Sequence, residues 1–411
     1  MKTLTSLLRY LKVRSPLTNS SLLLKRYFLA LFSVIFLFLP QTVNAVGNNG
    51  SEDPLKKGVD YIYNLEFEKA GQVLGNLREK RPDDPAPYFY TAMIYWGKLF
   101  FNYDRNAIKD LDLWLDKTIE VAEKKHNAEP ENGDAVFYLG GAYGFKGRIA
   151  LIERSWLQTY YYGKKGNNLL LDAENLAPAN YDIMLGLGMY NYFLARVPSV
   201  IKVLSFLLFL KGDSDLGIQQ IEQCAAKGTY AAPEARIVLA SIYTYFEKKP
   251  EKAIEHLNVL VQKYPDNPRF LYTLAIAYSK MRDEKKALVI AADIEDKISK
   301  RSQGIIDQWG PRTKYLQGEI LFEQNKYADA MPFYLNAITA AKGNSNDWVI
   351  QWSNMKLGMI NDALKNRELA KEYYRKVIDL NEIGEENVYV KNYAKQYIST
   401  PFVPGSQNNI E

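Results

Sequence analysis

Small and apolar residues recur along the chain with the spacing of paired amphipathic helices. In three C-terminal segments, a small residue in a first helix precedes an alanine in a second helix by twelve positions. These pairs are Ala275 and Ala287, Gly318 and Ala330, and Gly358 and Ala370. The constant offset predicts successive helical hairpins whose two helices approach closely at small side chains. No alternating apolar stretch of convincing length occurs, so the pattern predicts essentially no strand.

The units built around these pairs share further features. The first carries one extra residue near Pro250, and the others run without interruption. The four units contain Leu239-Ala240 with Ala253, Leu274-Ala275 with Ala287, Gly318 with Ala330, and Leu357-Gly358 with Ala370. They resemble the tetratricopeptide repeat (TPR), a helix pair of about 34 residues with Leu-Gly in its first helix and Ala in its second. On these matches the chain is identified as a member of that family. The resemblance implies an all-α fold, a right-handed α-solenoid of helical hairpins with helical insertions in the central repeats.

The same pattern divides the chain into segments. The expected order is a signal peptide (1–45), a flexible linker (46–53), N-terminal hairpins (54–132), central divergent hairpins with insertions (133–231), a C-terminal array (232–382), a capping helix (383–399) and a disordered tail (400–411). A capping helix is expected because a repeat array otherwise ends on an exposed apolar face.

Two central segments exceed what the repeat requires. Arg148–Asn168 is dense in aromatic and basic residues, and Pro198–Leu210 is almost entirely apolar. The second is expected to be an extra helix buried beneath the superhelix, because its thirteen residues are too few to span a membrane. The alternative is an apolar flap that contacts lipid or an acyl chain.

Residues 181–217 carry a second resemblance. A glycine-rich helix precedes the Pro198-led apolar helix, and a turn follows at Gly212-Asp213. This order is similar to the central region of the inclusion-body-clearance branch of TPR proteins. Members of that branch are intracellular and associate with organelle surfaces or lipid storage.

The N-terminus has the three parts of a secretory signal. Lys25-Arg26 precede an apolar run from Tyr27 to Leu39, Pro40 ends the run, and Val43 and Ala45 supply small residues for cleavage after Ala45. The sequence therefore predicts export to the periplasm or beyond. The alternative is an uncleaved membrane anchor.

Charge and composition narrow the possible functions. Six of the 52 basic side chains, and none of the 47 acidic ones, lie in residues 1–45, so the remainder carries a net charge of −1. A nearly neutral body gives no electrostatic reason to expect nucleic acid as a partner. Cys224 is the single cysteine, and His126 and His256 are the two histidines. Neither an internal disulfide nor a metal site of several thiolates can form, and no cofactor is expected.

Motifs that suggest catalysis have structural explanations. Gly140, Gly141, Gly144 and Gly147 could be mistaken for a phosphate loop, but they lie within a predicted first helix, where they allow close packing. Cys224 lies in an apolar helix and is expected to be buried and inert. No P-loop, HExxH motif or nucleophile elbow is present. An enzyme with an undetected site in the central insertions, around Glu153 and Arg154, is the remaining catalytic hypothesis.

Partner binding is expected along the concave surface that the first helices of TPR hairpins line. The family's inward-facing positions are the second, fifth, ninth and twelfth of that helix. Projected onto this sequence, the expected contact residues are Arg269, Tyr272, Ile276, Arg312, Tyr315, Glu319, Phe322, Trp352, Met355 and Met359. Aromatic, arginine and methionine side chains suit an extended peptide or an amphipathic helix. Because these side chains should face the groove, substituting Arg312 and Tyr315 with alanine is expected to weaken partner capture and leave the fold intact.

Together these features predict a non-enzymatic, exported scaffold that binds a protein or peptide partner. The alternative is a lipid- or membrane-associated factor that acts through residues 198–210. The partner's identity and the oligomeric state do not follow from the residues.

Overall fold

The computed structural model describes residues 53–102, 104–196, 212–341, 347–380 and 385–405. Within these ranges all regular secondary structure is helical, with seventeen α-helices, one short π-helix and no strand. The prediction of an all-α fold is therefore confirmed. The calls on residues 1–45 and Pro198–Leu210 lie outside the described residues. No described helix has both the length and the apolar character needed to cross a membrane.

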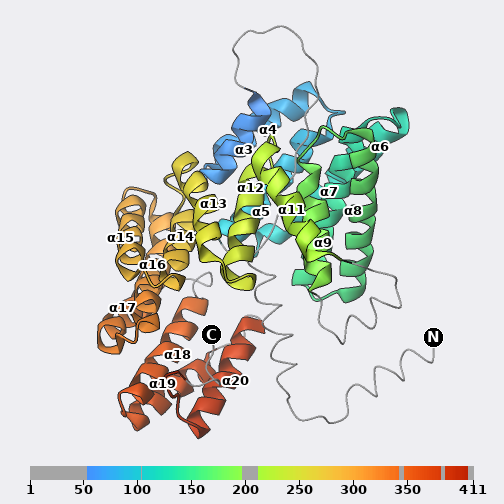
Figure 1. The fold of residues 1–411 in the computed structure, drawn as a ribbon. Helices are drawn as coiled ribbons and strands as arrows, with labels where there is room; N and C mark the ends of the chain where they lie inside the picture. Colours follow the sequence, from blue (N-terminus) through green and yellow to red (C-terminus); the bar gives the residue numbers. More distant parts are fainter. Residues whose placement is uncertain (1–52, 103, 197–211, 342–346, 381–384, 406–411) are drawn as a thin grey trace, which may run out of the picture.

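The helices pair in chain order as antiparallel hairpins (Figure 1). The N-terminal pairs are α3 (Pro54–Tyr63) with α4 (Phe67–Lys80), α5 (Pro85–Asn102) with α6 (Ala107–Ala128), α7 (Gly133–Ile152) with α8 (Trp156–Leu176), and α9 (Ile183–Ala195) with α11 (Ser214–Lys227). The C-terminal pairs are α12 (Ala232–Ser241) and η1 (Ile242–Phe246) with α13 (Pro250–Lys263), α14 (Pro268–Lys280) with α15 (Glu284–Ser299), α16 (Gln303–Glu323) with α17 (Tyr327–Ala340), and α18 (Asp347–Ala363) with α19 (Arg367–Asp379). Helix α20 (Glu385–Ser399) follows the last pair.

Small side chains mark the contact between the two helices of each C-terminal hairpin. Ala287, Ala330 and Ala370 are all 0% exposed. A Cβ atom added to Gly318 would lie 2.9 Å from the ring of Tyr334, and one added to Gly358 would lie 2.4 Å from the ring of Tyr374. At such distances there is no room for a methyl group. The glycine and the tyrosine that meet are sixteen residues apart, and the buried alanine of the twelve-residue spacing lies one helical turn before each tyrosine.

The tyrosines that fill this space also reach acidic side chains on the first helix of their hairpin. The Tyr334 hydroxyl donates to Glu319, and the Tyr374 hydroxyl donates to Asp362 Oδ2 at 2.9 Å. Both rings are fully buried, so their hydroxyls need a hydrogen-bond partner. Each tyrosine thus connects the centre of its hairpin with the concave face.

The extra residue near Pro250 is absorbed by a π-helix. The spacing from Ala240 to Ala253 is one residue longer than in the next three units, and η1 (Ile242–Phe246) lies within that interval. A π-turn takes up one additional residue without breaking the helix. Ala253 consequently remains 0% exposed.

The segment Arg148–Asn168 is not a separate insertion. It comprises the end of α7, a short turn and most of α8, and both helices exceed the usual length of a repeat helix. The second helix of this hairpin begins at Trp156. In the structure, a Cβ atom added to Gly166 would lie 2.9 Å from the Gly140 carbonyl oxygen. Gly166 therefore lets α7 and α8 approach backbone to backbone.

The first hairpin contacts the fifth and sixth hairpins, which are distant in sequence. Lys263 Nζ and the Tyr264 hydroxyl lie 2.8 Å and 2.6 Å from Asp60 Oδ1. Asn267 is 0% exposed and donates to the Tyr63 carbonyl oxygen at 2.7 Å. No sequence pattern predicts these contacts, because each repeat of an array is expected to contact only its neighbours.

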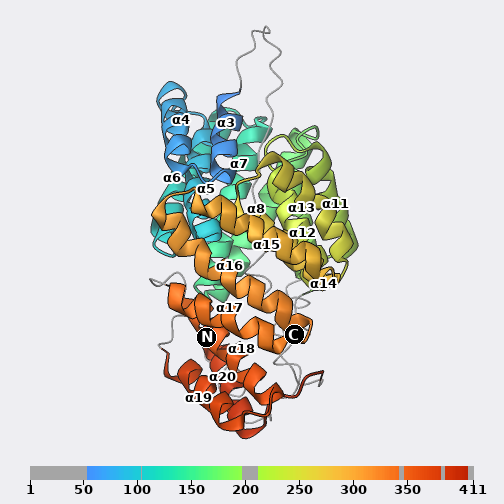
Figure 2. The ribbon, with the colours of Figure 1, turned by 90° about the vertical axis from the view of Figure 1, so that its left-hand side faces the viewer.

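This closure divides the molecule into a compact body and an arm. A single hydrophobic core extends from Leu55 to Ala277, whereas the hairpins from α14 onward are held by three smaller cores in succession. The hairpins from α14 to α20 form the arm, and Figures 1 and 2 show its part from α16 to α20 projecting away from the N-terminal hairpins. Its helix surfaces remain available on the side that the first hairpin does not cover.

The predicted disordered tail is wrong for residues 400–405. Phe402 is 4% exposed and belongs to the core that contains Met355, Met359 and Tyr374. Proline, glycine and polar residues dominate this segment, and it has no periodicity from which its one buried side chain could be recognised.

We expect Ala330→Leu to destabilise the protein by about 1–3 kcal/mol, because the larger side chain overpacks the contact between α16 and α17. Chemical denaturation measures the change. Ala328→Leu is the matched control, since Ala328 is exposed on the same helix. Equal stability of the two variants would contradict the register described above.

Candidate functional site

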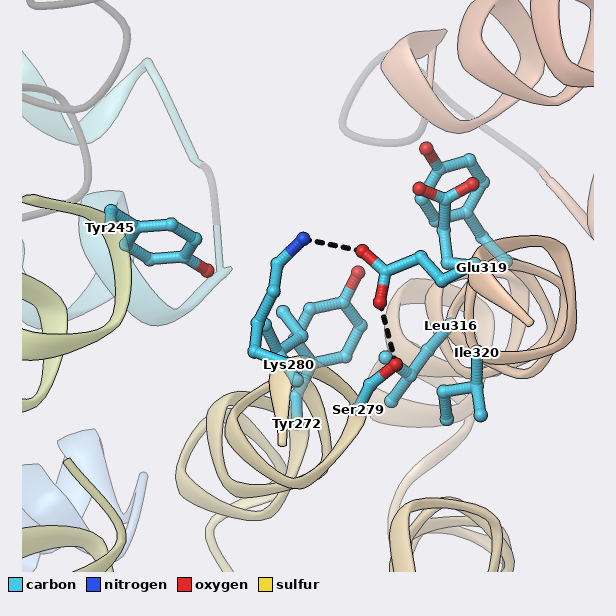
Figure 3. Close-up of a pocket in the computed structure, with 10 residues that line it drawn as sticks. Tyr245, Tyr272, Ser279, Lys280, Leu316, Glu319 and Ile320 are labelled. Atoms are coloured by element: carbon cyan, nitrogen blue, oxygen red, sulfur yellow. Dashed lines mark hydrogen bonds and ion pairs between the residues drawn. The ribbon is translucent and has the colours of Figure 1, made fainter. Parts of the chain in front are cut away.

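A hollow of about 170 Å³ lies on the concave side of the arm, between α14 and α16. Its lining residues come from η1, α14 and α16 and are mostly aromatic, aliphatic or charged. They are Tyr245, Tyr272, Ile276, Ser279, Lys280, Tyr315, Leu316, Glu319, Ile320 and Glu323. Figure 3 shows Tyr245 across the hollow from Glu319, with Lys280 between them. We call this hollow the α14–α16 pocket.

An ion pair crosses the pocket. Lys280 of α14 pairs with Glu323 of α16, and the Ser279 hydroxyl donates to the same carboxylate at 2.6 Å. Burial by itself would raise the pKa of Glu323, but the Lys280 ammonium and the Ser279 hydroxyl outweigh it and hold that pKa below its ordinary value. The pair therefore stabilises the fold at neutral pH, and this contribution is lost as the pH falls through the lowered pKa of Glu323. It fixes α14 against α16 at physiological pH.

A second carboxylate extends the site toward the C-terminal hairpins. Glu319 accepts from the Tyr334 hydroxyl and pairs with Lys356 Nζ of α18 at 2.9 Å. The same ammonium lies 4.3 Å from the centre of the Phe322 ring. Lys356 thus links the α14–α16 pocket to the concave face of α18.

The size of the pocket limits what it can hold. Sites for small molecules and cofactors usually enclose about 300–1,000 Å³. A volume of about 170 Å³ is closer to that of one or two amino-acid side chains. Tyrosine and isoleucine surface beside charged groups suits a side chain of a protein or peptide.

Six of the ten predicted contact residues keep accessible surface, and three of these six line the pocket. The partly exposed residues are Arg269, Tyr272, Ile276, Glu319, Phe322 and Trp352. Tyr272, Ile276 and Glu319 line the pocket. Arg269 lies elsewhere, with its guanidinium 4.9 Å from the Phe100 ring centre. Whether any of these residues binds a partner stays a prediction.

The other four predicted contact residues are buried. Arg312 is 1% exposed, Tyr315 7%, Met355 0% and Met359 1%. These four positions therefore offer a partner little surface in this structure, and whether any of them binds a partner stays a prediction. Tyr315 packs against Tyr334 and Trp348, with ring centres 5.6 Å and 5.3 Å apart. Only the edge of Tyr315 reaches the pocket.

Five pocket residues escaped the sequence analysis: Tyr245, Lys280, Leu316, Ile320 and Glu323. Tyr245 lies in η1, whose π-turn changes the direction of its side chain and could not be anticipated. Lys280 follows the predicted contact residue Ile276 by one helical turn, and Glu323 follows Glu319 by one helical turn. The sequence pattern could have indicated Glu323, because residues four apart share a helix face.

Other reactive side chains do not form a site within the described part of the chain. No group of three or more potential metal ligands occurs there. Cys224 is 0% exposed, and burial raises the pKa of its thiol. Trp156, Leu157 and Tyr161, from the aromatic-rich segment noted in the sequence, are exposed at the start of α8 and belong to neither core nor pocket.

We expect Arg312→Ala to lower stability by about 2 kcal/mol or more, since it removes a buried side chain that packs 5.2 Å from the Trp309 ring centre. This replaces the expectation that the fold would be unaffected. Lys314→Ala, on the same helix and 33% exposed, is the control and should change the melting temperature little. An Arg312→Ala protein as stable as the wild type would show that burial of the Arg312 side chain does not stabilise the fold.

Comparison with known proteins supports the repeat assignment. Two tetratricopeptide-repeat family models match, one at residues 236–267 and one at residues 353–383. No curated protein matches the chain. The inclusion-body-clearance resemblance stays a prediction.

Several solved structures are similar to this one at low sequence identity. The yeast Tom70 crystal structure is 12% identical, with a TM-score of 0.41, over 84% of this chain and 89% of that chain. NprR in complex with its cognate peptide NprX is 16% identical, with a TM-score of 0.44, over 84% of this chain and 82% of that one. A tetratricopeptide repeat protein from Parabacteroides merdae is 12% identical, with a TM-score of 0.32, over 83% and 97%.

The two family matches fall on α12–α13 and α18–α19, which are hairpins with the small-residue contacts described above. These two hairpins are therefore tetratricopeptide repeats, and the helical fold that contains them is a scaffold suited to binding other proteins.

Proposed function

We propose that this protein is a non-enzymatic scaffold that binds a protein or peptide partner on the concave side of its arm. The observation that carries the proposal is the α14–α16 pocket. It combines apolar surface from Tyr272 and Ile276 with the charged groups of Lys280, Glu319 and Glu323. An extended segment could place one side chain in the pocket and pair its own charges at the rim.

The structure offers the partner a rigid surface. The Lys280–Glu323 pair and the Glu319–Lys356 pair tie three successive hairpins together across this face. Little conformational entropy is then lost when a partner binds, and that favours affinity. A hollow beside Phe100 and Ile237, within the N-terminal body, is much smaller, at about 10 Å³.

The double variant Tyr272→Ala/Ile276→Ala tests this role. Both side chains are only partly buried, so the variant should keep its helical circular dichroism while capturing less partner from a native envelope extract. A tenfold loss of retained partner corresponds to about 1.4 kcal/mol. Val289→Ala is the matched control, because Val289 is 62% exposed on α15, outside the pocket. Capture that is unchanged in the double variant would rule out the α14–α16 pocket as the binding site.

We also propose that the protein acts in the cell envelope after export. The support is the order of basic, apolar and small residues in positions 1–45. Mass spectrometry of the protein purified from its native cells should find Val46 at the N-terminus. A chain that keeps residues 27–39 and sediments with membranes would instead support the uncleaved anchor, and an intact chain in the cytosol would exclude export.

A further inference from the structure

The residues after α20 fold back onto the concave face of the arm. Within Thr400–Pro404 one side chain is buried: Phe402 is 4% exposed, whereas its neighbour Val403 is 57% exposed. The Phe402 ring centre lies 6.1 Å from that of Phe322 on α16 and 5.8 Å from that of Tyr397 on α20. A single aromatic side chain therefore anchors a segment that is otherwise exposed.

A buried carboxylate holds the backbone of the same residue. The Phe402 backbone N–H donates to Asp362 Oδ2 at 2.9 Å. The Asp362 side chain is 0% exposed and also accepts from the Tyr374 hydroxyl at 2.9 Å and from Arg367 Nη1 at 2.8 Å. Two fixed donors thus orient the carboxylate, and the backbone of Phe402 completes its hydrogen bonding.

These contacts have the form in which extended peptides are recognised. One apolar pocket accepts a side chain, and one polar group of the receptor pairs with the peptide backbone. We call the set Phe322, Tyr397 and Asp362 the tail site. Phe322 and Asp362 both lie near the C-terminal ends of first helices, α16 and α18, on the face expected to bind partners.

The tail site is connected to the α14–α16 pocket. Lys356 lies over the Phe322 ring and pairs with Glu319, which lines the pocket. A partner that extends from the pocket toward α18 therefore meets Phe402. The segment 400–404 follows α20 directly, so it competes at an effective concentration on the order of millimolar.

We propose that the tail site is a recognition site for an extended peptide with an aromatic anchor residue, and that Thr400–Pro404 occupies it in cis and must leave before a partner binds there. This inference rests on the proposed scaffold function and adds its regulation. The contacts of Phe402 indicate which ligand the tail site would bind. Such a ligand has an aromatic side chain that packs beside Phe322 and Tyr397, and a backbone N–H that donates to Asp362.

Fluorescence anisotropy with a labelled peptide of residues 399–405, Ser-Thr-Pro-Phe-Val-Pro-Gly, tests the proposal on the full chain. The wild-type chain should bind this peptide weakly. Phe402→Ala, which empties the site, should bind it at least about tenfold more tightly, because the cis competitor is removed. Val403→Ala is the matched control and should behave as wild type. The same peptide with alanine in place of phenylalanine should not bind any of the proteins.

A folded Phe402→Ala protein that binds no peptide would overturn the proposal and leave Phe402 as a structural cap. Concentration-dependent dimers in sedimentation would also overturn it, since the tail of one copy would then fill the site of another. Because Phe402→Ala could lose the fold of the last hairpin, circular dichroism accompanies the measurement.

A second measurement keeps the wild-type packing. With 4-fluorophenylalanine at position 402, the fluorine resonance should move toward that of an exposed ring as unlabelled peptide is added. An unchanged resonance at saturating peptide would contradict displacement. This result is independent of the α14–α16 pocket, because capture through Tyr272 and Ile276 can persist even when the tail never leaves.

Discussion

The close contact between glycine or alanine on one helix and a large side chain on its partner is the constraint on which the arm depends. At Gly318 and Gly358 the opposing tyrosine ring leaves no space for even a methyl group. Because the backbones come so close, each tyrosine can cross its hairpin and present its hydroxyl to the concave face. Tyr334 reaches Glu319 in this way, and Tyr374 reaches Asp362. The packing that holds each hairpin together therefore also positions the acidic groups of both proposed binding sites.

The closure of the N-terminal half explains why the candidate site lies in the arm. Contacts of Asp60 and Tyr63 with residues near 264 bring the first hairpin against α13 and α14. The first helices of that half then bury their inward faces in one core, and aromatic residues such as Trp96 and Phe100 lie inside it. From α14 onward each hairpin packs mainly on its neighbours, and the concave face stays accessible. The same kind of helical hairpin thus forms both the compact body and the accessible face of the arm.

The two carboxylates of the concave face, Glu319 and Asp362, differ in their burial and in the partners that they already have. Glu319 is already neutralised by Lys356, so a ligand in the pocket need not supply a cation for it. Asp362 is fully buried, and one of its three hydrogen bonds comes from the chain's own tail. Removing that donor would uncover a desolvated carboxylate, which is costly unless another donor replaces it. Occupancy of this position by some backbone N–H is therefore strongly favoured.

The sequence by itself determined the helical class and the order of hairpins in the C-terminal half. It also determined which small residues are buried between paired helices, because a fixed spacing of small residues marks where two helices can approach closely. It also pointed to Tyr272, Ile276 and Glu319, since a helix face can be counted along the chain. Tertiary structure decided what no local pattern encodes: which of the counted residues are buried, as Arg312 and Met359 are, and that Asp60 meets Tyr264. It also decided that Phe402, in a segment without periodicity, is the residue that returns to the concave face. Curvature accumulates over several hairpins, so contacts between distant repeats depend on the summed geometry and not on any single stretch of sequence.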